Sequence, residues 1–203
     1  MAISELRSVL ELSGNKNICL SGGAKGADRL FGIWAEENKH EQLHFSFDGH
    51  YCGSASKYEV KLEMNQLRED IIVQLLHDAN RTLSRKVPHH SQFAYKLLAR
   101  NTWQIFATDS VYAMGILKSP SVLDGGTAWA VQMYLELCKN RNTNAVVYLF
   151  EINEHKAYQY CNASKMFIEC STVPTPNGIW TGIGSRIATA EHMKEFVQYF
   201  LVP

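Results

Sequence analysis

Two spacings of apolar residues alternate along the chain. Short runs that are apolar throughout, or at every second position, are typical of strands and occur at 17–20, 42–47, 110–115, 144–150 and 178–184. Runs with apolar residues three or four positions apart are typical of helices and occur at 3–12, 27–37, 58–83, 91–103, 128–138 and 188–201. Because strands alternate with helices, the chain predicts an α/β fold: a Rossmann-like, doubly wound, mostly parallel sheet with helices on both faces.

Smaller signals complete this pattern. Runs 156–161 and 165–170 alternate around a polar stretch at 162–164, which predicts a small β-hairpin. Ser4 and Thr189 stand where N-caps are expected, and Gly14 stands where a helix commonly ends. The stretches 48–56 and 118–124 are predicted loops.

Length and composition are typical of one globular domain. With 203 residues, 46% of them apolar and 20% charged, the chain is expected to form a single domain over 1–203. Twenty Lys and Arg balance twenty Asp and Glu, so nothing favours bulk attraction to nucleic acid or to an anionic membrane. Any anionic ligand must therefore be bound locally.

The five cysteines are scattered and contain no C-x-x-C pair, so neither a zinc site nor a disulfide framework is expected. His50 and Cys52 in the 48–56 loop would give a metal only two ligands, and we interpret that stretch as a polar loop. No apolar run approaches the roughly 18 residues of a membrane span, and no signal-peptide pattern is present. We expect a cytoplasmic protein without a membrane partner, a metal or a cofactor.

Three times an apolar strand leads into a glycine turn and then a helix, at 21–28, 125–127 and 182–186. Glycines permit positive φ and close backbone approach, and the free N–H groups of a helix start favour an anion. The G-G-x-x-G spacing of the first turn matches neither the dinucleotide motif nor the P-loop, so a tight turn without a ligand is the alternative. In a parallel sheet the three turns would meet at one edge and surround a nucleotide's phosphates and ribose.

The motifs S-G-G-A-K-G-A-D at 21–28, R-N at 100–101, G-G-T at 125–127 and G-I-G-S-R at 182–186 resemble those of the SLOG superfamily. That group of Rossmann-like proteins includes the DNA-processing protein A family, the LOG phosphoribohydrolases and small YspA-like proteins. The resemblance covers most of the chain except the 58–83 stretch and the hairpin, and it implies a nucleotide-derived ligand. The candidate ligand-binding residues are Ser21, Gly22, Gly23, Ala24, Gly26, Asp28, Asn101, Gly125, Gly126, Thr127, Gly182, Gly184, Ser185 and Arg186.

Two departures from the family pattern matter. In the relatives the G-I-G-S-R strand usually opens the domain, whereas here it lies near the C-terminus. Circular permutation would place strand 178–184 beside strand 17–21, and a duplicated half-unit is the alternative. The LOG motif P-G-G-x-G-T-x-x-E also lacks its acid here, since no carboxylate follows Thr127. We therefore expect binding more than turnover and assign no catalytic residue.

Individual roles follow from side-chain chemistry. Arg186 suits a bidentate phosphate contact, or else a surface salt bridge. Asp28 is expected to cap backbone amides or contact a ribose hydroxyl, and Asn101 to contact a base or ribose or to cap a helix end. Trp129 and Trp180 are expected in the core, with stacking on a base as the alternative.

The main hypothesis is a binder of an ADP-ribose-type or cyclic-nucleotide-type ligand that acts as a sensor or a sequestering protein. The alternative is a nucleotide N-glycosidase or phosphoribohydrolase that uses Asp28, Asp124 or Glu136 as the acid. A nucleic-acid-binding module is a third hypothesis, which the neutral net charge disfavours. A homodimer or higher homo-oligomer through the predicted 58–83 helix would fit related folds.

Overall fold

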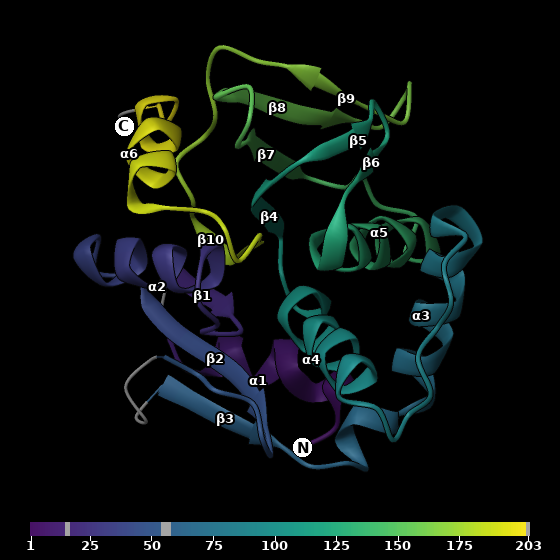
Figure 1. The fold of residues 1–203 in the computed structure, drawn as a ribbon. Coiled ribbons are helices and arrows are strands. Elements are labelled where there is room, and N and C mark those ends of the chain that lie inside the picture. Colours follow the sequence, from purple (N-terminus) through teal and green to yellow (C-terminus); the bar gives the residue numbers. More distant parts are fainter. Residues whose placement is uncertain (15–16, 54–57, 202–203) are drawn as a thin grey trace.

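The computed structural model describes residues 1–14, 17–53 and 58–201. Its centre is an eight-stranded sheet in the order β3-β2-β1-β10-β4-β7-β8-β9 (Figure 1). Neighbouring strands are parallel from β3 to β7, and β8 and β9 add an antiparallel hairpin at one edge. The predicted fold class and the hairpin are confirmed. The strands are β1 Asn17–Ser21, β2 Glu41–Phe47, β3 Glu59–Leu62, β4 Ser110–Gly115, β7 Val147–Glu151, β8 Lys156–Cys161, β9 Met166–Glu169 and β10 Gly178–Gly184.

Helices cover both faces of the sheet and bury a separate core on each (Figure 1). Because successive strand residues point to opposite faces, Ile18 and Leu20 enter one core while Cys19 enters the other. The first face carries α1, α3, α4 and α5, and the second carries α2 and α6. The helices are α1 Leu6–Leu12, α2 Ala27–Glu37, α3 Asp70–Leu83, α4 Phe93–Phe106, α5 Gly125–Asn140 and α6 Ala190–Gln198, with short 3-10 helices at Ile3–Glu5 and Gln66–Arg68.

The last strand of the chain lies in the middle of the sheet. β10 is inserted between β1 and β4 and is parallel to both, with Ile18 beside Ile179 and Thr181 beside Val111. The Thr181 hydroxyl donates to the Leu20 carbonyl over 2.6 Å. The pairing of strand 178–184 with the first strand, predicted from the displaced motif, is confirmed.

The prediction of one helix over 58–83 was wrong. Its first part is the edge strand β3, whose Val60 and Leu62 pack on the core, and only 70–83 form an α-helix. Apolar positions of a strand and of a helix follow each other without a break there, so together they imitate one long helical pattern. The predicted oligomer face is therefore not one continuous helix, and α3 packs on α4 and α5.

Of the smaller predictions, some are confirmed and others are wrong. Thr189 caps α6 by accepting a hydrogen bond from the His192 amide, and Gly14 has a φ of 74° just after α1, as expected. Ser4 is not a cap, because it lies inside the Ile3–Glu5 helix. The stretch 118–124 is not a plain loop but contributes to a two-stranded hairpin of β5 Leu117–Ser119 and β6 Val122–Leu123. Of the 48–56 loop, residues 54–56 lie outside the described chain.

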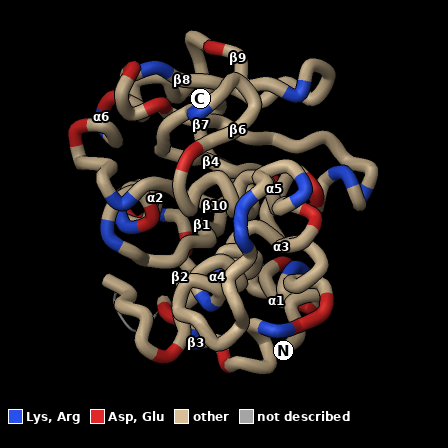
Figure 2. The backbone as a smooth tube through the Cα atoms, turned by 45° about the vertical axis from the view of Figure 1, so that its right-hand side comes forward, with Lys and Arg blue, Asp and Glu red and all other residues tan. Residues whose placement is uncertain are grey.

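Charged residues of both signs are interspersed along the chain (Figure 2). Among the described residues, no helix combines the length and the apolar character that crossing a membrane would require.

Candidate functional site

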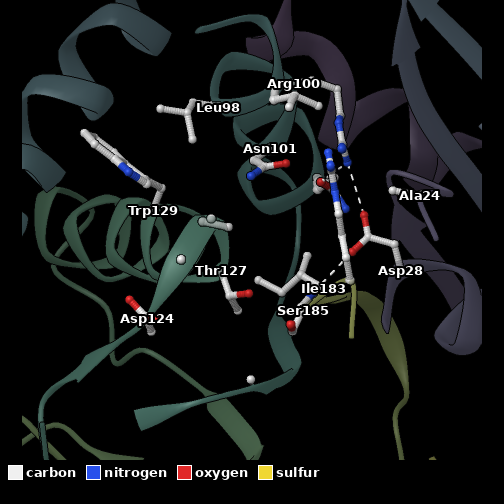
Figure 3. Close-up of a pocket in the computed structure, with 18 of the residues that line it drawn as sticks. Ala24, Asp28, Leu98, Arg100, Asn101, Asp124, Thr127, Trp129, Ile183 and Ser185 are labelled. Atoms are coloured by element: carbon white, nitrogen blue, oxygen red, sulfur yellow. Dashed lines mark hydrogen bonds and ion pairs between the residues drawn. The ribbon is translucent and has the colours of Figure 1, made fainter. Parts of the chain in front are cut away.

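A cavity that several candidate residues line lies where two neighbouring strands lead into helices on opposite faces of the sheet. β10 and β4 are neighbouring parallel strands, but the helix after β10 is α6 on one face and the helix after β4 is α5 on the other. Such a switch point opens a crevice at the carboxyl ends of the strands. A cavity of about 480 Å³ lies there, lined by the ends of both strands, the start of α5 and one side of α4 (Figure 3). It brings together the candidate residues Ala24, Asp28, Asn101, Gly125, Gly126, Thr127, Gly184, Ser185 and Arg186.

The turn that starts α5 is open. A Cβ added at Gly125 or Gly126 would have no described heavy atom within 4 Å. Gly125 has a φ of 62°, and within the described chain the N-cap Asp124 makes no side-chain capping bond. The first N–H groups of an α-helix have no partner inside the helix, so this turn presents free amides and the positive end of a 16-residue helix to the cavity.

The turn between β1 and α2 is filled instead. The Gly22 amide donates to Asp28 Oδ2 over 3.2 Å, the Gly23 amide donates to Ser21 Oγ over 3.2 Å, and the Ala27 amide donates to the Ser185 carbonyl over 3.1 Å. A Cβ at Gly22 would overlap the Arg100 guanidinium, and one at Gly26 would overlap the Ser185 carbonyl. Ser21, Gly22, Gly23 and Gly26 do not line the cavity, although Ala24 and Lys25 of this turn and Asp28 in the first turn of α2 do.

Asp28 joins three parts of the site. Its Oδ2 accepts from the Gly22 amide and from Arg100 Nη1, and its Oδ1 accepts from the Gly184 amide, each over 3.2 Å. The expectation that Asp28 binds backbone amides is confirmed, but these amides belong to the two neighbouring turns rather than to its own helix. Burial raises the pKa of Asp28, while the charge and the hydrogen bond of Arg100 oppose that rise.

Arg100 is a second central residue, which the sequence showed only as part of a motif. Its side chain is 4% exposed and also donates from Nη1 to Gln104 Oε1 over 2.6 Å. Arg100 Nε, Gln104 Nε2 and His50 Nδ1 are buried without a hydrogen-bond partner in the described structure. Burial, Arg100 and Arg186 lower the pKa of His50 to about 4, so this ring is neutral at pH 7. The sequence signal that could have identified it is an arginine in a helical pattern next to the apolar residues Leu98, Ala99 and Trp103.

The end of β10 and the turn after it supply another wall of the cavity. A Cβ at Gly182 would overlap the Phe31 ring, and the Ser185 amide donates to the Met114 carbonyl over 2.8 Å, so this turn is packed tightly on its neighbours. Ser185 and Arg186 line the cavity, while Gly182 does not. The salt bridge considered for Arg186 is not formed with any described carboxylate.

The remaining candidates differ in whether they line the cavity. Asn101 lies in the middle of α4, so it does not cap the helix end, and it projects into the cavity between Leu98 and Arg100 (Figure 3). Trp129 is nearly buried but lines the cavity from α5. Trp180 is fully buried and donates from Nε1 to His40 over 3.1 Å, which makes it a core residue.

The charges of the cavity do not balance. Two of its basic side chains have acidic partners: Arg100 pairs with Asp28 over 3.2 Å, and Arg85 approaches Asp124 at 3.8 Å. Lys25 and Arg186 also line the cavity and have no ion-pair partner among the described residues. The site therefore carries an excess of positive charge next to the open start of α5.

Neither the third candidate acid nor a metal cluster is found at this site. Glu136 lies elsewhere on α5, where Gln132 Nε2 donates to it over 3.1 Å and Lys139 approaches it at 3.4 Å. No group of three or more His, Cys, Asp or Glu side chains that could hold a metal occurs among the described residues.

Comparison of the chain with protein-family models, with curated proteins and with solved structures found no match. The resemblance to the SLOG superfamily therefore stays a prediction from the motifs at 21–28, 100–101, 125–127 and 182–186. The geometry and the charges of the cavity are the observations that bear on function.

Proposed function

We propose that this protein binds an anionic, nucleotide-derived small molecule, of the ADP-ribose or cyclic-nucleotide type, in the cavity at the start of α5. The bound molecule is held rather than cleaved, so the protein acts as a sensor of its ligand or sequesters it.

One observation carries this proposal: an open helix N-terminus faces the same cavity as two basic side chains without acidic partners among the described residues. The amides of Gly126 and Thr127 can donate to phosphate oxygens, and the macrodipole of α5 favours the negative charge. Lys25 and Arg186 add compensating charge, and Arg186 can bind two oxygens at once. The absence of a Cβ at Gly126, where neither φ nor packing requires glycine, leaves room for a ligand to approach the backbone.

The rest of the cavity suits the remainder of a nucleotide. Its volume is within the roughly 300–1,000 Å³ range of small-molecule sites. Leu98 and Trp129 form an apolar side, opposite the charged side formed by Arg100 and Asp28 (Figure 3). A ligand with a ring at one end and an anion at the other matches this division, and Asn101 lies between the two sides.

The available carboxylates favour holding the ligand over cleaving it. Both oxygens of Asp28 already accept hydrogen bonds from within the protein, from the Gly22 and Gly184 amides and from Arg100, which leaves this carboxylate poorly placed to exchange a proton with a ligand. Ala130 lines the cavity three residues after Thr127, where the LOG motif has its glutamate. N-glycoside cleavage would therefore depend on Asp124, whose side chain is 62% exposed.

Calorimetry tests the proposal with a panel of AMP, ADP-ribose, cyclic ADP-ribose and phosphate-free adenosine. We expect at least one phosphate-bearing compound to bind and adenosine not to bind. Arg186→Ala is expected to weaken binding about tenfold, whereas the matched variant Lys194→Ala, which removes an exposed charge on α6, should change it less than twofold. If no compound binds to folded protein, the proposal is wrong, and release of free base from a bound nucleotide would support the enzyme alternative.

A further inference from the structure

We infer that Arg85 is a positioning residue for the anion-binding turn: its guanidinium holds the backbone of 123–125 so that the first amides of α5 face the ligand. This inference rests on the proposed function, because it assigns the part of the chain that orients the proposed anion site. Arg85 is not in any of the sequence motifs and lies outside α5 itself.

The end of α3 fixes where Arg85 begins. Ser84 adopts a left-handed conformation, with φ 50° and ψ 44°, and its amide donates to the Asn80 carbonyl over 2.8 Å. The Arg85 amide then donates to Asn80 Oδ1 over 2.9 Å. These two bonds end the helix and anchor the Arg85 backbone beside α5, on which α3 packs.

The side chain of Arg85 contacts three consecutive residues of the turn. Nη1 donates to the Gly125 carbonyl over 2.7 Å, Nη2 lies 3.5 Å from the Leu123 carbonyl, and Nη2 lies 3.8 Å from Asp124 Oδ1. The Asp124 carboxylate is mostly exposed to solvent, so its ion pair contributes little. The short bond to the Gly125 carbonyl is therefore the main contact, and the planar fork of arginine lets its second nitrogen reach the Leu123 carbonyl.

Fixing that carbonyl orients the proposed ligand donor. In a planar trans peptide the C=O of one residue and the N–H of the next point in opposite directions. With the Gly125 carbonyl held toward Arg85, the Gly126 N–H is directed away from Arg85. No described side chain packs against the two glycines, because a Cβ at Gly125 or Gly126 would meet no described heavy atom within 4 Å. Two backbone hydrogen bonds also anchor the turn: the Asp124 amide donates to the Ile116 carbonyl over 2.8 Å, and the Ala128 amide donates to the Asp124 carbonyl over 3.3 Å.

NMR amide spectra of ¹⁵N-labelled full-length protein test this inference with inorganic phosphate as the probe. Arg85→Lys keeps the charge but loses the fork, and Arg85→Gln loses the charge but keeps one side-chain N–H donor. Arg81→Lys and Arg81→Gln are matched controls, because Arg81 is an exposed arginine on α3 that pairs with Asp78 and does not touch the turn. Thermal unfolding of each variant identifies any loss of folding.

We expect the Gly125, Gly126 and Thr127 resonances to shift or broaden in both Arg85 variants before any phosphate is added. On titration, Arg85→Lys should weaken phosphate binding at least fivefold despite its unchanged charge, and both Arg81 variants should match the wild type. Unchanged resonances in folded Arg85 variants, or binding by Arg85→Lys within twofold of wild type, would overturn the positioning role. If wild-type protein binds no phosphate while the Arg85 variants still change the free spectrum, the positioning role stands and the proposed anion site fails.

Discussion

Two glycine-rich turns lie at the same edge of the sheet, one before α2 and the other before α5. At the first, the space beside the glycines contains protein: Arg100 lies against Gly22, and Ser185 lies against Gly26. At the second, the space beside Gly125 and Gly126 is open to the cavity. The same residue type therefore serves close packing in one turn and access to the backbone in the other. Because Asp28 already occupies amides of the first turn, an external anion has better access to the second.

The largest effect is expected from removing the negative charge of Asp28, whose carboxylate binds an amide of the filled turn and pairs with Arg100. Asp28→Asn should lower the free energy of unfolding by about 4 kcal/mol, because it leaves the buried Arg100 guanidinium without its counter-charge. Urea unfolding measures the change. Asp48→Asn is the matched control, since that carboxylate is almost fully exposed and pairs only with Lys61 among the described residues, and it should have almost no effect. Equal, small effects of both variants would mean that Asp28 does not hold the turns together.

Replacing one glycine by alanine in each turn compares the packing of the two turns directly. Gly22→Ala should lower the free energy of unfolding by about 3 kcal/mol, because its Cβ overlaps the Arg100 guanidinium. Gly126→Ala should change stability by less than about 0.5 kcal/mol, because its Cβ meets no described atom, and should instead weaken ligand binding. Unfolding curves and calorimetry on both variants separate the two effects. Similar destabilisation by both substitutions would contradict the distinction between a filled and an open turn.

Acid is expected to lower the stability of the protein through His44, a buried residue that pairs with Ser21 across β1 and β2. Burial is the main cause that lowers the pKa of His44 on β2 to about 4, against an ordinary value of 6.5. The unfolded chain therefore takes up this proton first as the pH falls, so stability is complete above pH 6.5 and decreases between pH 6.5 and 4. The loss is about 2.5 kcal/mol by pH 4.5. His44→Gln should reduce this pH dependence, measured by urea unfolding, and substitution of the exposed His77 should not. The same slope in all three proteins would be inconsistent with a buried neutral His44.

The smallest effect concerns Lys25, a basic residue of the filled turn whose side chain lines the cavity. Lys25→Ala should weaken binding of a phosphate-bearing ligand roughly threefold, since this side chain contributes long-range attraction that salt screens. The salt dependence of the affinity, measured by calorimetry, should become shallower in the variant. An unchanged affinity and an unchanged salt dependence would show that Lys25 does not contribute to the charge of the site.

Local patterns predicted most of the fold, and they failed where two patterns merged. Short runs that are apolar throughout or at alternate positions predicted β1, β2, β4, β7 and β10, and the displaced G-I-G-S-R motif predicted that β10 pairs with β1. The strand β3 was missed because its Val60 and Leu62 continue into the apolar spacing of α3. Sequence motifs brought the correct turns to one edge, but they could not distinguish a filled turn from an open one. That difference depends on Arg100 and Ser185, which come from elements far away along the chain.

The position of a bound anion tests the central claim most directly. Crystals of the wild-type protein soaked in tungstate, a heavy analogue of phosphate, would show the anion by its anomalous signal. We predict one strong peak within hydrogen-bond distance of the Gly126 and Thr127 amides, in the cavity that Lys25 and Arg186 also line. A peak against the Gly22 and Gly23 amides, with the Asp28 carboxylate displaced, would contradict the account, as would crystals without any peak in the cavity.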